Sequence, residues 1–117
     1  MTTITREHLE LAALAAGMTP VRMSDDGRAL LVADQAEPWR PHTDPGDAAR
    51  LAVRLDISVD IDGSTAFAHV DGYEDMDDCG YGSAEHDGTE PDKLRAWCEA
   101  VTLCAATIGL RMKENER

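Results

Sequence analysis

Two Asp-Gly pairs, each set between segments with alternating apolar residues, constrain the fold of this 117-residue chain most strongly. Asp26-Gly27 and Asp62-Gly63 are typical of two-residue hairpin turns, because Asp and Gly tolerate the positive φ angles that such turns require. The sequence therefore predicts two antiparallel β-hairpins.

The position of each turn also predicts which residues lie opposite one another. In the first hairpin, Met23 is expected to face Leu30, and Val21 is expected to face Val32. In the second hairpin, the expected pairs are Ile57 with Ala68, Val59 with Ala66, Asp56 with His69, Asp60 with Thr65 and Ser58 with Phe67.

Three amphipathic segments flank and separate the hairpins. Apolar side chains recur three and four positions apart in residues 5–16, 45–55 and 91–109. Asp44 is expected to cap the second helix and Pro45 to begin it, whereas Gly17 and Gly109 are expected to end the first and third helices. The expected buried residues of the last two helices are Ala48, Leu51, Ala52, Leu55, Leu94, Trp97, Cys98, Val101, Ala105 and Ile108.

These elements predict an α+β fold with the order αββαββα. A four-stranded antiparallel sheet with helices packed on it is the simplest architecture that buries every apolar face. The chain length suits a single domain over residues 1–117, with a core large enough to fold without disulfides.

Acidic residues dominate the charge of the chain. The sequence has 23 acidic residues against 11 Lys and Arg, a formal net charge of −12. Direct binding of nucleic acid or of an anionic membrane requires clustered basic residues, so we expect neither. Aromatic residues make up 4% of the chain, too few to form a platform on which bases stack.

The acidic residues concentrate in residues 71–90, which we expect to form a glycine-containing loop. This segment holds eight acidic residues, no Lys or Arg, and both tyrosines of the chain, Tyr73 and Tyr81. Connections of this length in compact domains are usually functional or disordered. A solvated loop and a binding surface both remain open for it.

Metal binding and catalysis find little support in the motifs. Asp75, Asp77 and Gly80 match three positions of a calcium loop, but Cys79 and His86 stand where two further oxygen ligands are needed. The cysteines lack the paired spacing of a structural zinc site. The histidines are isolated in the sequence, and there is no nucleophile elbow or phosphate-binding glycine loop. We therefore expect no enzyme, no cofactor and no specific metal site.

Residues 39–55 resemble a motif of the phage ABA-sandwich family, which comprises small bacteriophage and prophage proteins. In this motif, tryptophan and proline precede an acidic-glycine-acidic N-cap and an apolar helix. The matching residues are Trp39, Pro41, Asp44, Gly46, Asp47, Ala48, Arg50, Leu51, Ala52, Val53 and Leu55. Residues 96–109 look like the last helix of that family. The resemblance implies a phage-type origin and a helix–sheet–helix sandwich, and it carries over no catalytic residues.

Together, the acidic segment and the resemblance predict a non-enzymatic phage-type accessory protein that binds a basic surface of a host protein. Clustered carboxylates can occupy a groove that otherwise binds nucleic acid, so we expect a nucleic-acid-binding partner. An inhibitor of a nucleic-acid-handling defence system, of the anti-CRISPR or DNA-mimic type, is the most concrete form of this function. The expected contact residues are Asp56, Asp60, Asp62, Asp71, Tyr73, Glu74, Asp75, Asp77, Asp78, Tyr81, Glu85 and Asp87.

Two other functions remain open. The chain could be a structural phage module that forms a homodimer through Trp97 and its apolar neighbours, or a weak binder of divalent metal ions. The odd number of cysteines and the absence of a signal-peptide pattern favour the cytoplasm of a bacterial host.

Overall fold

The computed structural model describes residues 4–33, 35–70 and 81–115. Its elements are α1 (Arg6–Ala15), β1 (Pro20–Met23), β2 (Leu30–Val32), α2 (Pro45–Leu55), β3 (Ile57–Asp62), β4 (Thr65–Val70), β5 (Tyr81–Glu85) and α3 (Glu90–Asn115). The predicted α+β class is confirmed. The order of elements differs from the expected one by the additional strand β5.

The strands form two antiparallel sheets, so the prediction of one four-stranded sheet is wrong. One sheet pairs β1 with β2, and the other has the order β3-β4-β5. Strand β5 lies within the segment 71–90 that we expected to be a loop throughout. Its residues Gly82 and Ser83 have weak β-propensity and carry no alternating apolar pattern, so pairing with β4 rather than local preference makes this segment a strand.

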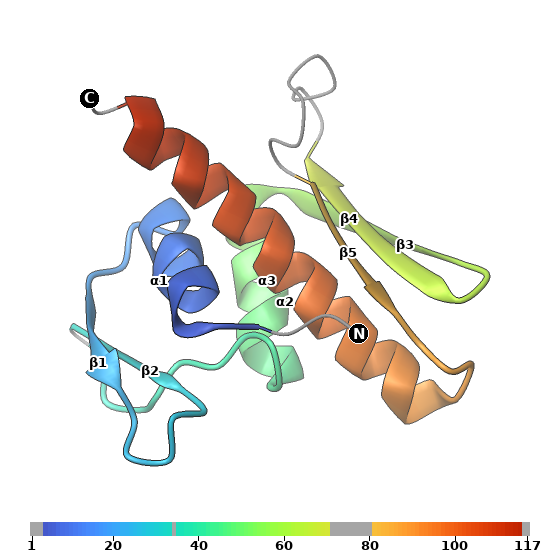
Figure 1. The fold of residues 1–117 in the computed structure, drawn as a ribbon, viewed down its shortest axis with the longest axis horizontal. Helices are drawn as coiled ribbons and strands as arrows, with labels where there is room; N and C mark the ends of the chain where they lie inside the picture. Colours follow the sequence, from blue (N-terminus) through green and yellow to red (C-terminus); the bar gives the residue numbers. More distant parts are fainter. Residues whose placement is uncertain (1–3, 34, 71–80, 116–117) are drawn as a thin grey trace.

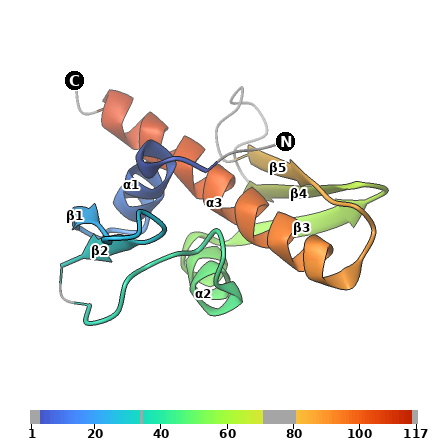
Figure 2. The same ribbon diagram turned by 60° about the horizontal axis from the view of Figure 1, so that its bottom comes forward.

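Helix α3 is the central element of the fold. It contacts α1, α2 and every strand of the larger sheet, and it runs across one face of that sheet towards α1 (Figure 1). Helices α2 and α3 lie on the same side of the sheet (Figure 2). The described part of the chain therefore does not place helices on both faces, as a helix–sheet–helix sandwich would.

Two glycines allow α3 to pack closely against its neighbours. A Cβ atom at Gly82 of β5 would lie 2.4 Å from the backbone oxygen of Ala100, and one at Gly109 would lie 1.9 Å from the backbone oxygen of Leu11. Helix α3 continues through Gly109 to Asn115, so our prediction that this glycine ends the helix is wrong. Close contact with α1 is the physical role of Gly109, which lies well inside the helix.

Helix α2 follows its sequence pattern closely. Asp44 is the N-cap and accepts a hydrogen bond from the N–H of Gly46, and Pro45 is the first residue of the helix. Of the expected buried stripe, Leu55 is half-buried, and the other three residues, Ala48, Leu51 and Ala52, are buried. Helix α1 likewise ends just before Gly17, which has a φ of +76°.

The register of the first hairpin is only partly as predicted. Met23 faces Leu30, which confirms that pair. Val32 faces Pro20 instead of Val21, because the register shifts between Pro20 and Arg22. A bulge of this kind leaves one extra residue of the strand without a cross-strand partner, and it bends the strand. Val21 is consequently 60% exposed.

The register of the second hairpin differs from the prediction by two residues. Asp62 pairs with Thr65, so the two-residue loop is Gly63-Ser64 rather than Asp62-Gly63. The expected cross-strand pairs are therefore wrong; the observed ones are Ile57 with Val70, Ser58 with His69, Val59 with Ala68, Asp60 with Phe67 and Ile61 with Ala66. A shift of two residues leaves every side chain on its predicted face, because side chains alternate with a period of two.

One apolar core joins the helices to the inner face of the larger sheet. It includes Leu9 of α1, Leu51 of α2, Ile57 of β3, Ala68 of β4 and Val101 of α3. Within the described residues, no helix has the length and hydropathy needed to cross a membrane.

Candidate functional site: the acidic sheet and its apolar groove

The net charge of the chain is localised to the larger sheet and its connections. Residues 56–92 contain 12 acidic residues and no Lys or Arg, so this stretch alone carries the formal charge of −12. The other 11 acidic residues are balanced by the 11 Lys and Arg. The stretch without Lys or Arg therefore extends on both sides of the acidic segment 71–90.

The outer face of the β3-β4-β5 sheet is polar, and α2 and α3 pack on its other face. Asp60 and Asp62 of β3 and Glu85 of β5 are exposed there. The pairs Asp62–Thr65 and Thr65–Glu85 place two of these carboxylates in one row across three strands. The same face carries Ser58, Thr65, Phe67, His69 and Ser83, by the alternation of the strands.

His69 approaches a different carboxylate from the one predicted. Its Nε2 lies 3.3 Å from Oδ2 of Asp60, its diagonal neighbour across the β3–β4 pair. Asp56 instead forms the C-cap of α2, with a φ of +57° in the left-handed region, and Ser58 takes the place opposite His69. The side chains of the observed pair are 40% exposed for His69 and 77% exposed for Asp60, and the contact is an ion pair when His69 is protonated.

The remaining predicted contact residues occupy several places. Glu85 ends β5, and Asp87 lies in the turn between β5 and α3. Tyr81 begins β5. Six of the predicted residues lie outside the described part of the chain: Asp71, Tyr73, Glu74, Asp75, Asp77 and Asp78.

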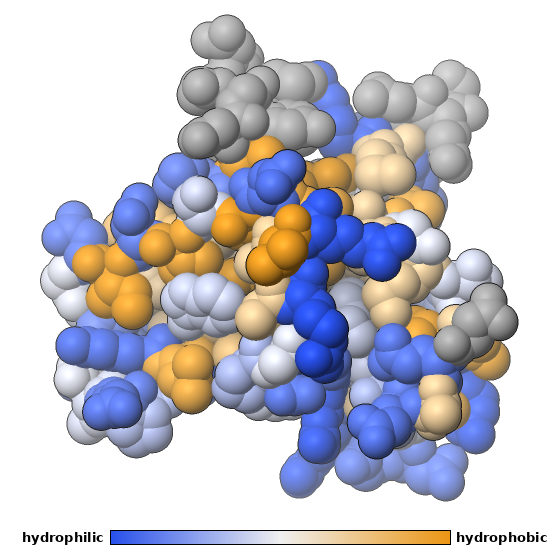
Figure 3. Space-filling model, turned by 180° about the vertical axis from the view of Figure 1, so that it is seen from behind, coloured by the Kyte–Doolittle hydropathy of each residue, from blue (hydrophilic) through white to orange (hydrophobic). Residues whose placement is uncertain are grey.

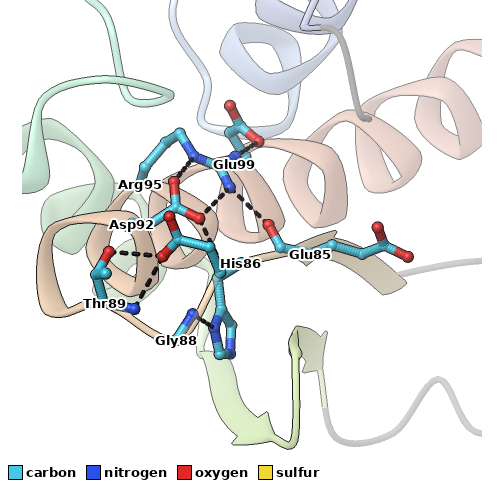
Figure 4. Close-up of polar contacts among 8 residues, drawn as sticks. Glu85, His86, Gly88, Thr89, Asp92, Arg95 and Glu99 are labelled. Atoms are coloured by element: carbon cyan, nitrogen blue, oxygen red, sulfur yellow. Dashed lines mark hydrogen bonds and ion pairs between the residues drawn. The ribbon is translucent and has the colours of Figure 1, made fainter.

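Arg95 ties the end of β5 to the first turns of α3. Its guanidinium donates to Oδ1 of Asp92 at 2.7 Å, to Oε1 of Glu99 at 2.5 Å and to the backbone oxygen of Glu85 at 2.6 Å. Asp92 also accepts from the backbone N–H of Asp87 at 2.7 Å. Figure 4 shows these groups converging on one guanidinium. The network fixes the acidic turn on the helix.

His86 lies beside this network, and its ring points away from Arg95 (Figure 4). The residue is 7% exposed, and its Nδ1 accepts a hydrogen bond from the N–H of Gly88. The first contact lies within the turn, and the bond from the N–H of His86 to the backbone oxygen of Ser64 connects the turn to the β3–β4 loop.

The local hydrogen bonds keep the carboxylates of this turn ionised. Donation from Arg95, and secondarily from the N–H of Asp87, lowers the pKa of Asp92 to about 2. Hydrogen bonds from Thr89 lower the pKa of Asp87. Burial raises the pKa of Glu99, against the opposing effect of Arg95. The turn between β5 and α3 therefore keeps Asp87 and Asp92 charged at neutral pH.

The described residues offer little for metal or covalent chemistry. They contain no group of three or more His, Cys, Asp or Glu side chains arranged to hold a metal ion. Cys98 and Cys104 are buried, and burial raises the pKa of the Cys98 thiol to about 11. A thiol that stays protonated at neutral pH is a poor nucleophile and a poor ligand.

An apolar groove of about 410 Å³ lies beside the acidic sheet. Its walls come from α2, β3 and the first half of α3, and nearly all the surface inside it is carbon. The lining residues are Pro45, Ala49, Ile61, Glu90, Lys93, Leu94 and Trp97. Seen from behind, the molecule shows apolar patches among charged side chains (Figure 3).

Sequence reasoning missed this groove. We expected Leu94 to belong to the buried stripe of the last helix, but it is 47% exposed, and Ile61 is 46% exposed. Ala96 and Ala100 lie on the buried face of α3, whereas Leu94 lies on another side of the helix and outside the core. The spacing of these residues along the helix was the available signal.

Acidic and basic residues together line a second, polar cleft away from the larger sheet. This cleft of about 1050 Å³ lies between the turn of the first hairpin and the start of α2, and its lining includes Arg28, Arg40 and Arg50. Asp47, which is buried, accepts from Arg50 at 2.6 Å and from the backbone N–H of Arg40 at 3.1 Å. Acidic and basic groups are mixed here, so the cleft does not extend the acidic surface.

Comparison of the chain with protein-family models, with curated proteins and with solved structures gives no match. The resemblance of residues 39–55 to the phage ABA-sandwich motif therefore remains a prediction from the sequence.

Proposed function

We propose that this protein is a non-enzymatic binding protein whose acidic sheet docks on a basic surface of a partner protein. The single observation that carries this proposal is that residues 56–92 hold the whole net charge of the chain, with the exposed Asp60, Asp62 and Glu85 on a sheet face opposite α2 and α3. Concentrated charge of one sign steers a partner of opposite charge and sets its orientation.

The partner in this proposal is a protein that itself binds nucleic acid. Duplex DNA presents about one negative charge per 1.7 Å of axis, so a surface built to hold it also attracts a dense array of carboxylates. Together with the phage-like motif of residues 39–55, this chemistry makes an inhibitor of a nucleic-acid-handling defence system, of the anti-CRISPR or DNA-mimic type, the most concrete form of the function.

A competition experiment tests the role of the sheet. The full chain is added to a complex of duplex DNA with a basic, sequence-independent DNA-binding protein of bacteria, and release of the DNA is followed by fluorescence anisotropy at several salt concentrations. The wild-type protein should release the DNA at low salt, and release should weaken as salt rises. The triple variant D60N/D62N/E85Q should require several-fold more protein for the same release.

The matched control removes three exposed carboxylates from the charge-balanced part of the chain. The variant E7Q/E37Q/E114Q has the same net charge as D60N/D62N/E85Q. It should release DNA as well as the wild type. Equal losses in both variants would mean that total charge rather than the sheet governs binding, and the proposal would fail.

The apolar groove favours a second candidate function, self-association through the region of Trp97. Trp97 and Leu94 line the groove together with Ile61, and exposed apolar surface of this kind is often covered by another protein. Sedimentation of the wild-type chain over a range of concentrations tests this function, since a dimer formed through apolar contacts should persist at high salt.

A further inference from the structure

We infer that the groove between α2, β3 and α3 receives an apolar side chain of the same basic partner. In the partner's sequence or surface, Lys or Arg residues flank this apolar side chain. The inference rests on the proposed function and adds the place where the apolar anchor of the partner binds.

The first argument is the position of the apolar residues. On α2, Pro45, Ala49 and Val53 follow one another at intervals of four residues and are all exposed. Val53 is 78% exposed, the largest value among the described bulky apolar residues. Three elements thus bring apolar side chains to one surface beside the groove, as in the core of a protein–protein interface.

The second argument is the charge next to the groove. Ile61 lines the groove from β3, which is an edge strand of its sheet, and its neighbours Asp60 and Asp62 point to the opposite face. A partner that covers this edge contacts Ile61 on one side and the two carboxylates on the other. Glu90 adds an acidic group to the groove itself, where Lys93 is the basic lining residue.

This charge distribution selects a basic partner over a second copy of the chain. A symmetric dimer that covered both the groove and the β3 edge would bring two copies of Asp60, Asp62 and Glu90 together, and like charges at an interface oppose association. A basic segment instead pairs with these carboxylates while its apolar side chain leaves water. Apolar anchors surrounded by complementary charge are the usual source of affinity at such interfaces.

Two synthetic peptides measure the contribution of the groove. One consists of lysine and serine only, and the other has a single leucine in place of its central serine. Binding of each labelled peptide to the full chain is followed by fluorescence anisotropy at low salt. For the wild type, the leucine should raise the affinity about tenfold, as expected for burial of one apolar side chain.

The groove variants should lose this gain. L94Q/I61T removes two apolar walls at half-exposed positions without changing charge, and A49Q obstructs the groove from an exposed helical site. L110Q is the matched control, because Leu110 is 44% exposed on the same helix but does not line the groove. Each groove variant should bind the peptide with leucine and the peptide without it with the same affinity. L110Q should keep the tenfold gain in affinity that the leucine gives.

The outcomes separate the inference from the proposed function. If the lysine–serine peptide binds in a salt-sensitive way and leucine adds nothing, the groove inference is wrong and the proposed function stands. If neither peptide binds, or if D60N/D62N/E85Q binds both as tightly as the wild type, the proposed function is wrong. A wild-type dimer that dissociates in A49Q would assign the groove to a second copy and overturn the inference.

Discussion

Gly109 determines how closely α1 approaches α3. A Cβ atom at this position would overlap the backbone oxygen of Leu11, with a separation of 1.9 Å. The obstacle is backbone rather than a flexible side chain, so it cannot be relieved by a change of rotamer. This contact explains why a residue with poor helix propensity lies inside a continuous helix.

We predict that Gly109→Ala destabilises the protein by about 2 kcal/mol or more, since overpacking of a tight contact forces the backbone to move. The free energy of unfolding in urea provides the measurement. Gly46→Ala is the control, because a Cβ atom there would lie 3.5 Å from its nearest neighbours, and we expect a change within about 0.5 kcal/mol. Equal effects of the two substitutions would contradict the close-contact explanation.

At the scale of the elements, the Arg95 network joins the end of strand β5 to the start of α3. Asp92 is bound by Arg95 and by the N–H of Asp87, and these contacts lower the pKa of Asp92 from 3.8 to about 2. A carboxyl group whose pKa is lower in the folded state than in the unfolded state stabilises the fold at any pH above the unfolded pKa. That contribution is lost as the pH falls from about 4 to about 2.

We therefore predict that Asp92→Asn lowers the thermal unfolding temperature at neutral pH and flattens its decline between pH 4 and pH 2. Arg95→Met should flatten the same part of the profile, because it removes the main cause of the lowered pKa. Thermal unfolding followed by circular dichroism across this pH range tests both variants. If the unfolding temperature of both variants falls as steeply as that of the wild type between pH 4 and pH 2, this network does not control the acid sensitivity.

At the scale of the whole molecule, the excess of acidic charge is concentrated in one stretch of the chain. Residues 56–92, from the start of the larger sheet to the first turn of α3, carry the formal net charge of −12, and the rest of the chain is balanced. Repulsion among carboxylates on one sheet opposes folding, and salt screens it because the Debye length falls to about 3 Å at 1 M salt. The same arrangement that attracts a basic partner should therefore cost stability at low salt.

We predict that D60N/D62N/E85Q is more stable than the wild type at low ionic strength, by about 1 kcal/mol or less, as is typical of exposed charge interactions. E7Q/E37Q/E114Q, which loses the same number of charges, should gain less. The unfolding temperatures of the wild type and the two variants, measured from 10 mM to 1 M salt, should converge at the highest salt concentration. A gain that is equal in both variants, or that persists at 1 M salt, would argue against repulsion localised on the sheet.

The sequence by itself determined the features that depend on neighbouring residues. The Asp44-Pro45 start of α2, the end of α1 before Gly17 and the two hairpins follow from backbone preferences that act over a few residues. The faces of β3 and β4 were also predictable, since alternation survives a register error of two residues.

Only the tertiary structure decided the features that depend on contacts between distant segments. Strand β5 exists because residues 81–85 pair with β4, and α3 passes Gly109 because α1 packs there. The apolar groove arises because the side of α3 that carries Leu94 faces away from the core, next to Ile61 and Ala49. Local sequence patterns carry no information about such contacts, because the free energy that stabilises them comes from packing between elements far apart in the chain.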